Sequence, residues 1–245
     1  MDVICARAVD LAERTTGGLH SFVAERLRQL VSNRNACLLD VGCGTGSLIA
    51  KLQGLGFQKL LGLDIKPPSN LPGIDFLQCD LDNCKTSLES GSIDLAIAVE
   101  VFEHVENIGG LLQEPSRLLG ATGMLLLTTP NVHSLEARIR FLLTGHLKQF
   151  DSIGDPPHIT PIFRFPFERI LKRHGFVVIQ TWGHPEDGSS RTSRRSLRLL
   201  AQAACWLGLK GEPAGDTLFM LLGRTADWDQ SGNPELKSDY LTARY

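Results

Sequence analysis

Short apolar runs rich in β-branched residues alternate along this sequence with stretches of helical period. Such alternation is typical of βαβ units, in which a mostly parallel sheet carries helices on both faces. One run, IDLAIAVE at residues 93–100, is apolar almost throughout, as expected for a central strand buried on both faces. We expect strands at Ala36–Val41, Leu60–Ile65, Ile74–Cys79, Ile93–Val99, Met124–Thr128, Phe176–Trp182 and Thr217–Leu222.

Helical periods fill most of the intervals between these runs. With 245 residues, the chain is long enough for one large α/β domain with a substantial core. We expect this domain to span residues 1–224, with a helical insertion at about 184–216 and a polar tail at 225–245. The expected helices are Ser21–Val31, Ser47–Gln53, Ile108–Leu119, Ser134–Leu143 and Pro166–Arg173.

The composition is that of an ordinary globular protein, 42% hydrophobic and 21% charged, with a formal net charge of −2. This balance gives no global attraction to nucleic acid. The N-terminal residues include the acids Asp2, Asp10 and Glu13, which a signal peptide would lack. No apolar run approaches the ~20 residues that are needed to cross a bilayer. The six cysteines form neither a C-x-x-C pair nor a dense framework, which predicts free thiols in a cytoplasmic protein.

A glycine-rich stretch, DVGCGTGS at residues 40–47, follows the first expected strand and opens the next helix. Glycine permits a positive φ and lets a ligand reach the main chain, and the helix start offers N–H groups to an anionic group. Gly42, Gly44 and Gly46 therefore indicate a ligand site. A strand-to-helix turn with spare glycines is the alternative, and the triplet alone fits both interpretations.

Acidic residues at the next two strand ends favour the ligand site. Asp64 closes the second strand eighteen residues after Gly46, where a carboxylate can accept both ribose hydroxyls of an adenosine ligand. Asp80 closes the third strand, where it could accept from an adenine amino group while Leu81 packs on the ring. Ser47 stands where the dinucleotide-binding motif has its third glycine, which disfavours that motif. The sequence contains no G-K-[ST], so a P-loop is excluded.

Taken together, LLDVGCGTG, GLDI, CDL and EVFEHVEN resemble the ordered motifs of the class I S-adenosylmethionine-dependent methyltransferases. The resemblance covers roughly Cys37 to Asn131. It implies a Rossmann-like sheet of seven mostly parallel strands with the last strand antiparallel, and S-adenosylmethionine as cofactor. Asp40 would brace the glycine turn from behind. The other implied cofactor residues are Gly42, Gly44 and Gly46 at the methionine part, Asp64 at the ribose, Asp80 and Leu81 at the adenine, and Glu100.

The sequence EVFEHVEN places Glu100, Glu103 and His104 at the end of the fourth strand. If the chain is helical from about Glu100, the three side chains share one face beside the transferable methyl. In one interpretation His104 is the general base for a hydroxyl acceptor, a task that suits an imidazole with a pKa near 6.5. In another, these residues and His158 hold Mg²⁺ or Mn²⁺, which acidifies the hydroxyl. In a third, the acids only face the positive end of a helix.

This cluster resembles that of small-RNA 2′-O-methyltransferases and of ubiquinone-pathway O-methyltransferases, some of which use a metal. His158, in GDPPHITP, lies in a loop expected over the same mouth. We expect His104, His158 and Glu103 to act in catalysis without a bound metal, with Mg²⁺ or Mn²⁺ as the alternative.

A basic amphipathic segment at 191–209 bears on the acceptor. It opens with four arginines and no acid and continues with apolar residues at helical spacing. It fits a helix that caps the sheet, or a surface for a lipid-like acceptor or for peripheral membrane contact. An RNA substrate would favour a basic groove with stacking aromatics, but only 7% of the residues are aromatic.

We therefore expect O-methylation of a small-molecule, quinone-like, glycan or lipid-linked acceptor. The alternatives are an RNA 2′-O-methyltransferase, a non-catalytic binding module of methyltransferase fold, and an NAD-dependent oxidoreductase. Ser47 and the absence of a Tyr-x-x-x-Lys pair disfavour the oxidoreductase. The sequence does not indicate an oligomeric state.

Overall fold

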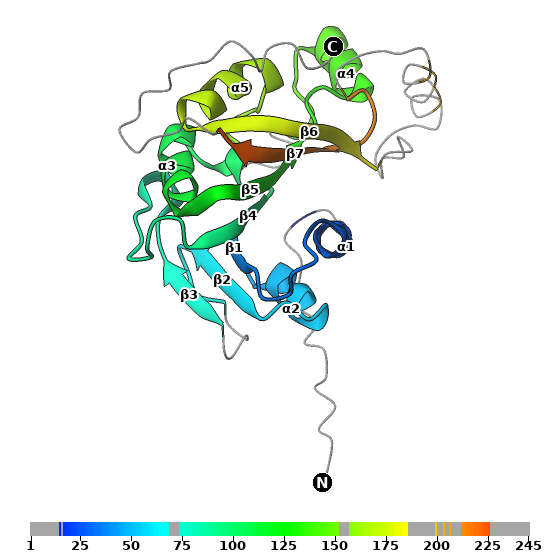
Figure 1. Cartoon of the computed structure of the whole chain (residues 1–245). Helices are drawn as coiled ribbons and strands as arrows, with labels where there is room; N and C mark the ends of the chain where they lie inside the picture. Colours follow the sequence, from blue (N-terminus) through cyan, green and yellow to red (C-terminus); the bar gives the residue numbers. More distant parts are fainter. Residues whose placement is uncertain are drawn as a thin grey trace.

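A seven-stranded sheet forms the centre of the computed structural model, which describes residues 15, 17–68, 74–151, 157–185, 199, 203, 206 and 212–225 (Figure 1). The strand order is β3-β2-β1-β4-β5-β7-β6. Adjacent strands among β1 to β5 are parallel, whereas β7 is antiparallel to both β5 and β6, which confirms the expected sheet. The strands are β1 (Cys37–Val41), β2 (Lys59–Asp64), β3 (Asp75–Gln78), β4 (Ile93–Val99), β5 (Leu119–Pro130), β6 (Phe176–His184) and β7 (Thr217–Arg224).

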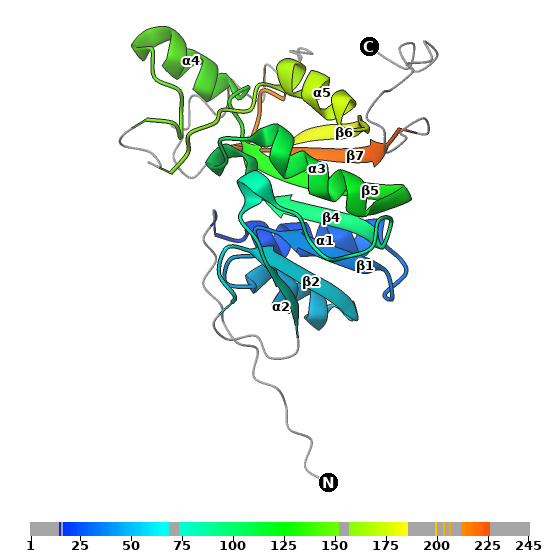
Figure 2. The same cartoon turned by 90° about the vertical axis from the view of Figure 1, so that its left-hand side faces the viewer.

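Helices cover both faces of the sheet (Figures 1 and 2). Helices α1 (Leu19–Leu30) and α2 (Ser47–Gly54) pack on one face, and α3 (Ile108–Leu118) and α5 (Arg164–Arg173) pack on the other. Helix α4 (Leu135–Thr144) follows β5 and buries only Ala137. Two 3₁₀ turns, η1 (Leu81–Asn83) and η2 (Phe102–His104), follow β3 and β4. No helix among the described residues is long and apolar enough to cross a membrane.

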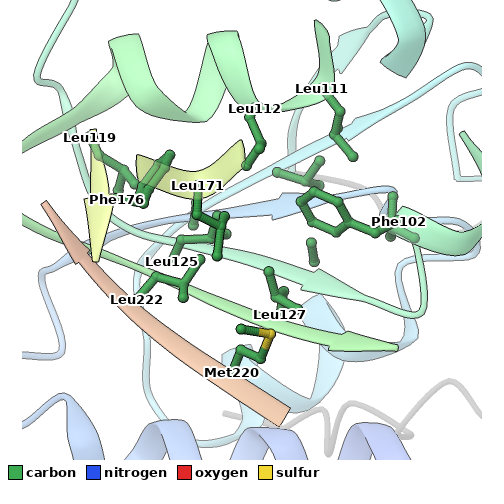
Figure 3. Packing of buried hydrophobic residues seen from close by; sticks show 14 of the residues in the cluster. Phe102, Leu111, Leu112, Leu119, Leu125, Leu127, Leu171, Phe176, Met220 and Leu222 are labelled. Carbon is green, nitrogen blue, oxygen red and sulfur yellow. The ribbon is translucent and has the colours of Figure 1, made fainter. Parts of the chain in front are cut away.

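The core lies in two layers because the central strands are apolar on both faces. In β4, Ala96 and Ala98 pack toward α3 and α5, whereas Leu95 and Ile97 pack toward α1 and α2. Figure 3 shows the first layer, in which Phe102 from η2 lies against side chains of β5 and α3. This packing fixes the end of β4, and with it the turn that carries His104.

Most expected elements end within two residues of the observed ones, but β5 begins at Leu119 rather than at Met124. The strand starts directly where α3 stops, and the 120–123 segment, rich in glycine, extends it. A register shift between Ile93 and Leu95 accommodates the extra residues beside β4. Most of the expected insertion at 184–216 and the tail from 226 onward lie outside the described residues.

The expectation that every cysteine is a free thiol is wrong for one pair. Cys79, directly after β3, and Cys84, directly after η1, form a disulfide across Cα atoms 5.4 Å apart. The 3₁₀ turn between them folds the chain back and brings the two side chains together. Cys37 and Cys43 are free thiols.

Candidate active site

The glycine turn after β1 needs glycine for two physical reasons. Gly42, Gly44 and Gly46 have φ values of 74°, 52° and 80°, in the left-handed region that residues with a Cβ disfavour. A Cβ added to Gly42 would also lie 2.7 Å from Cγ2 of Val101. The turn is held in place because the N–H groups of Gly42 and Cys43 both donate to the carbonyl oxygen of Leu63, at 2.7 and 3.1 Å.

Acids at the ends of β2 and β3 lie beside this turn. The N–H of Gly44 donates a 2.8 Å hydrogen bond to Oδ2 of Asp64, so the second strand end holds the glycine turn. Oδ1 of Asp80 accepts from the N–H of Asp82 at 3.1 Å and caps η1. The carboxylates are therefore fixed by the main chain around them.

A cavity of about 260 Å³ opens at the carboxyl ends of β1 to β4. The sheet order reverses between β1 and β4, which is where open α/β sheets bind ligands. Of the expected cofactor residues, Gly42, Asp64, Asp80, Leu81 and Glu100 line this cavity. Asp40, Gly44 and Gly46 are not among its lining residues. The other lining residues are Ile65, Asp82, Val101, His104 and Val105.

Asp40 is buried behind the glycine turn, with 4% of its surface exposed. Its Oδ2 has no hydrogen-bond partner among the described residues. Burial, with a smaller contribution from the charge of Asp64, raises the pKa of Asp40 to about 8. The N–H of Gly44 in the glycine turn donates to Asp64 rather than to Asp40.

The E-x-x-E-H cluster does not form the helix face expected from its spacing. Glu100 has a φ of 53°, and the 3₁₀ turn η2 starts only at Phe102. The side chain of Glu100 turns to Thr128, whose Oγ1 donates to Oε1 at 3.1 Å. Glu103 is fully buried, whereas His104 is exposed and lines the cavity. Because the chain is left-handed at Glu100 and η2 is only one short turn, the three residues do not share one helix face.

The loop after α4 brings His158 to His104. The ring centroids of the two histidines are 4.7 Å apart in an edge-to-face arrangement. Nδ1 of His104 lies 3.1 Å from the carbonyl oxygen of Pro157, and Nδ1 of His158 lies 2.8 Å from that of Gln149. A carbonyl oxygen only accepts, so each Nδ1 carries the proton and each Nε2 of the neutral ring carries a lone pair.

One carboxylate joins this pair. Each of Glu103, His104 and His158 has a potential ligand atom within 4.8 Å of the others. The main chain of Glu103 also holds the loop, because its carbonyl oxygen accepts from the N–H groups of Ile159 and Thr160 at 2.8 and 3.0 Å. The structure thus brings three of the four residues of the expected cluster together and leaves Glu100 at the cavity wall.

Sequence reasoning missed some residues that shape the cavity. Oδ1 of Asp82 accepts from the N–H of Asn107 at 2.7 Å, which ties η1 to the start of α3. Asn107 in turn caps α3 by accepting from Gly110 at 2.9 Å. The second acid of CDLDN and an asparagine before a helix were the available signals. Ile65, Val101 and Val105 are ordinary apolar residues, and no sequence pattern distinguishes them.

The comparisons with known proteins agree with this geometry. A family model described as a methyltransferase domain matches residues 15–181. A ubiquinone biosynthesis O-methyltransferase of Bradyrhizobium diazoefficiens is 31% identical over 102 residues, which cover 38% of this chain and 40% of that protein. The chain therefore matches about two fifths of the length of this relative. A probable S-adenosylmethionine-dependent methyltransferase of Mycolicibacterium smegmatis is 27% identical over 189 residues, covering 70% and 66% of the two chains.

Solved structures share the fold at low identity. A SAM-dependent methyltransferase from Archaeoglobus fulgidus has a TM-score of 0.58 at 18% identity and covers 84% of this chain and 94% of its own. Geranyl diphosphate C-methyltransferase from Streptomyces coelicolor A3(2) has a TM-score of 0.56 at 13% identity, with coverages of 88% and 85%. The family match spans well over half of the chain and includes every strand end that lines the cavity. The chain therefore belongs to the methyltransferase domain family, and it shares its fold with solved S-adenosylmethionine-dependent methyltransferases.

Proposed function

We propose that this enzyme methylates a hydroxyl oxygen of a small-molecule or lipid-linked acceptor, with His104 as the general base. The observation that carries the proposal is the contact of His104 Nδ1 with the carbonyl oxygen of Pro157, which leaves Nε2 as the acceptor of a ring that lines the cavity. A lone pair on Nε2 at this position can take a proton from an acceptor hydroxyl. The named activity of the ubiquinone-pathway relatives, O-methylation, is compatible with this assignment.

The cavity residues fit an adenosyl ligand. Asp64 and Asp80 present carboxylates at adjacent strand ends, and Gly42 leaves the backbone open beside them. We assign Asp64 to the ribose hydroxyls, Asp80 with Leu81 to the adenine, and the glycine turn to the methionine part. When bound, S-adenosylmethionine supplies an electrophilic methyl group on a positively charged sulfur.

The protein's task in the reaction is to remove one proton. When the methyl group passes from sulfur to the acceptor oxygen, Nε2 of His104 would take up the hydroxyl proton. The imidazolium would then carry the positive charge that the sulfonium loses, leaving a neutral ether and a neutral thioether sulfur. His158 lies beside His104 and orients it, with the Pro157–Thr160 loop held against η2 by the carbonyl of Glu103.

A metal-assisted reaction is the second candidate, favoured by the donor set of Glu103, His104 and His158. Two ligand atoms on opposite sides of a Mg²⁺ ion are about 4.2 Å apart, so atoms within 4.8 Å need little movement to meet one ion. Metal-bound histidines usually donate their other ring N–H to a carbonyl, as both do here. Mg²⁺ or Mn²⁺ held by these residues would acidify the acceptor hydroxyl.

The test uses methyl-labelled S-adenosylmethionine with a panel of catechols and matched thiol and amine analogues. We expect label in an ether product. His104→Ala should lower kcat by about 10²–10⁴-fold while cofactor affinity stays within twofold. His146→Ala, an exposed histidine after α4, is the matched control. Transfer only to sulfur or nitrogen, or full activity in His104→Ala, would contradict the proposal.

A chelator separates the two candidates. If His104 acts as a base alone, activity survives removal of divalent ions. If the three residues hold a metal, chelation abolishes activity and Mn²⁺ restores it, and the protein broadens the electron paramagnetic resonance signal of added Mn²⁺. His158→Gln should then remove this Mn²⁺ binding without unfolding the chain.

A further inference from the structure

We infer that the segment after β5 docks on an anionic lipid bilayer and sets the cavity mouth at its surface. The docking surface consists of the exposed apolar side chains of this segment. They come from the end of α4, from the loop that leads into α5 and from the first turn of α5. They are Phe141, Leu142, Leu143, Ile159, Phe163 and Phe165.

Exposed large apolar residues are concentrated in this segment. Eleven such residues are found among the described residues, and six of them fall between 141 and 165. Leu142 and Leu143 are the extreme cases on α4, with 82% and 76% of their surface exposed. Single exposed apolar residues are normal, but a cluster of this size marks a surface that meets something apolar.

The position of α4 also argues for a contact. Figures 1 and 2 both place α4 on the β6 side of the sheet, and Figure 2 shows it projecting from the body of the molecule. A helix that buries only Ala137 gains little from packing on its own domain. The apolar end of α4 is therefore available for contact with another molecule.

The docking surface reaches the reaction site. Ile159 directly follows His158, and its N–H donates to the carbonyl oxygen of Glu103 at 2.8 Å. His158 in turn packs against His104, which lines the cavity. An amphiphilic acceptor could thus keep its apolar part in the bilayer while its polar head enters the cavity.

The local charge identifies the kind of bilayer. Residues 135–174 carry seven Lys and Arg against four Asp and Glu, a formal charge of +3 in a chain whose net charge is −2. Arg169, Lys172 and Arg173 are exposed on α5. Apolar side chains flanked by cations match the boundary between acyl chains and anionic headgroups.

Three residues from another part of the chain agree with this assignment. Of the basic segment 191–209, only Leu199, Ala203 and Trp206 are described, and all three are helical and exposed. Trp206 has 86% of its surface exposed, and tryptophan is favoured at membrane interfaces.

The experiment is co-sedimentation of the full chain with vesicles of phosphatidylcholine alone and of phosphatidylcholine with 30% phosphatidylglycerol. We expect binding to the anionic vesicles that weakens at least tenfold between ~0.05 and ~0.5 M salt. Leu142→Asp with Leu143→Asp should weaken binding at least tenfold. Reversal of the cations by R169E, K172E and R173E should remove the preference for anionic lipid. Ile179→Asp, at an exposed isoleucine on β6, is the control and should bind like wild type.

Thermal midpoint and S-adenosylmethionine affinity, measured on each variant, show that the fold and cofactor site are intact. Vesicle binding needs neither cofactor nor acceptor, so its failure is distinguishable from failure of the proposed O-methylation. The inference is overturned if wild type stays in the supernatant with both vesicles, or if the Leu142/Leu143 variant binds as well as wild type. It is equally overturned if this face proves to be a subunit interface, seen as a dimer that the same variant dissociates without any vesicle binding.

Discussion

The N–H of Gly44 donates a 2.8 Å hydrogen bond to Oδ2 of Asp64, which joins the glycine turn after β1 to the strand end of β2. One carboxylate thus serves the fold and faces the cavity at the same time. Substituting it should therefore affect both the shape of the turn and the affinity for an adenosyl ligand.

Asp64→Ala should weaken binding of S-adenosylmethionine about 10–100-fold, since a hydrogen bond to a charged group contributes about 1.5–3 kcal/mol. The demethylated product contains the same ribose, so its affinity should fall by the same factor in calorimetric titrations. Asp75→Ala, at an exposed acid that begins β3, should leave both affinities unchanged. Equal affinities for wild type and Asp64→Ala would refute the ribose assignment.

Gly42→Ala should lower the free energy of unfolding by about 1–3 kcal/mol, because alanine disfavours a φ of 74° and its Cβ meets Val101 at 2.7 Å. Adding Val101→Ala should restore part of the loss by removing the contact but not the backbone strain. Gly54→Ala, at the end of α2 where an added Cβ would have no atom within 4 Å, should instead gain up to about 1 kcal/mol. Chemical denaturation measures all three, and a neutral Gly42→Ala would contradict the argument.

The sequence was sufficient to predict the sheet and the meeting of its acidic strand ends at one cavity. Asp64 and Asp80 follow apolar runs, and the carboxyl ends of parallel strands share one edge, so their proximity follows from the topology alone. The geometry after Glu100 could not be predicted in this way. Its left-handed φ depends on the fit between Thr128 in β5 and the end of β4, a contact between residues 28 positions apart.

The pairing of His158 with His104 was expected only from the position of the loop, and its detail was not. The ring nitrogens are fixed by the carbonyls of Pro157 and Gln149, and main-chain acceptors leave no trace in a residue pattern. Cys79 and Cys84 illustrate the same limit. Their spacing is unremarkable, and only the η1 turn makes them neighbours.

The buried carboxyl of Asp40 should make stability depend on pH. An unfolded aspartate loses its proton near pH 4, whereas the folded chain holds this pKa at about 8. Between these values the folded state binds more protons, so stability falls as pH rises, by up to about 1.4 kcal/mol per pH unit for this group. Asp40→Asn should flatten that dependence. Urea unfolding of both proteins from pH 5 to 8 tests this prediction. It would be contradicted if the free energy of unfolding had the same pH dependence in wild type and in Asp40→Asn.

The disulfide Cys79–Cys84 should couple the redox state to the affinity for S-adenosylmethionine. The two cysteines enclose Asp80, Leu81 and Asp82, all of which line the cavity. Closing a six-residue loop lowers the entropy of the unfolded chain and so stabilises the fold by about 2 kcal/mol. In the folded chain, the disulfide limits how far Asp80, Leu81 and Asp82 can move away from the cavity. Reduction with a dithiol should therefore lower the thermal midpoint and weaken cofactor binding several-fold.

The double variant Cys79→Ser with Cys84→Ser provides the control for this prediction. It keeps the free thiols Cys37 and Cys43, so any effect of the dithiol on those residues remains visible. We expect the variant to bind S-adenosylmethionine like reduced wild type and to be insensitive to reductant. Equal affinities for oxidised and fully reduced wild type, with thiol titration confirming the reduction, would show that η1 alone holds Asp80 in place.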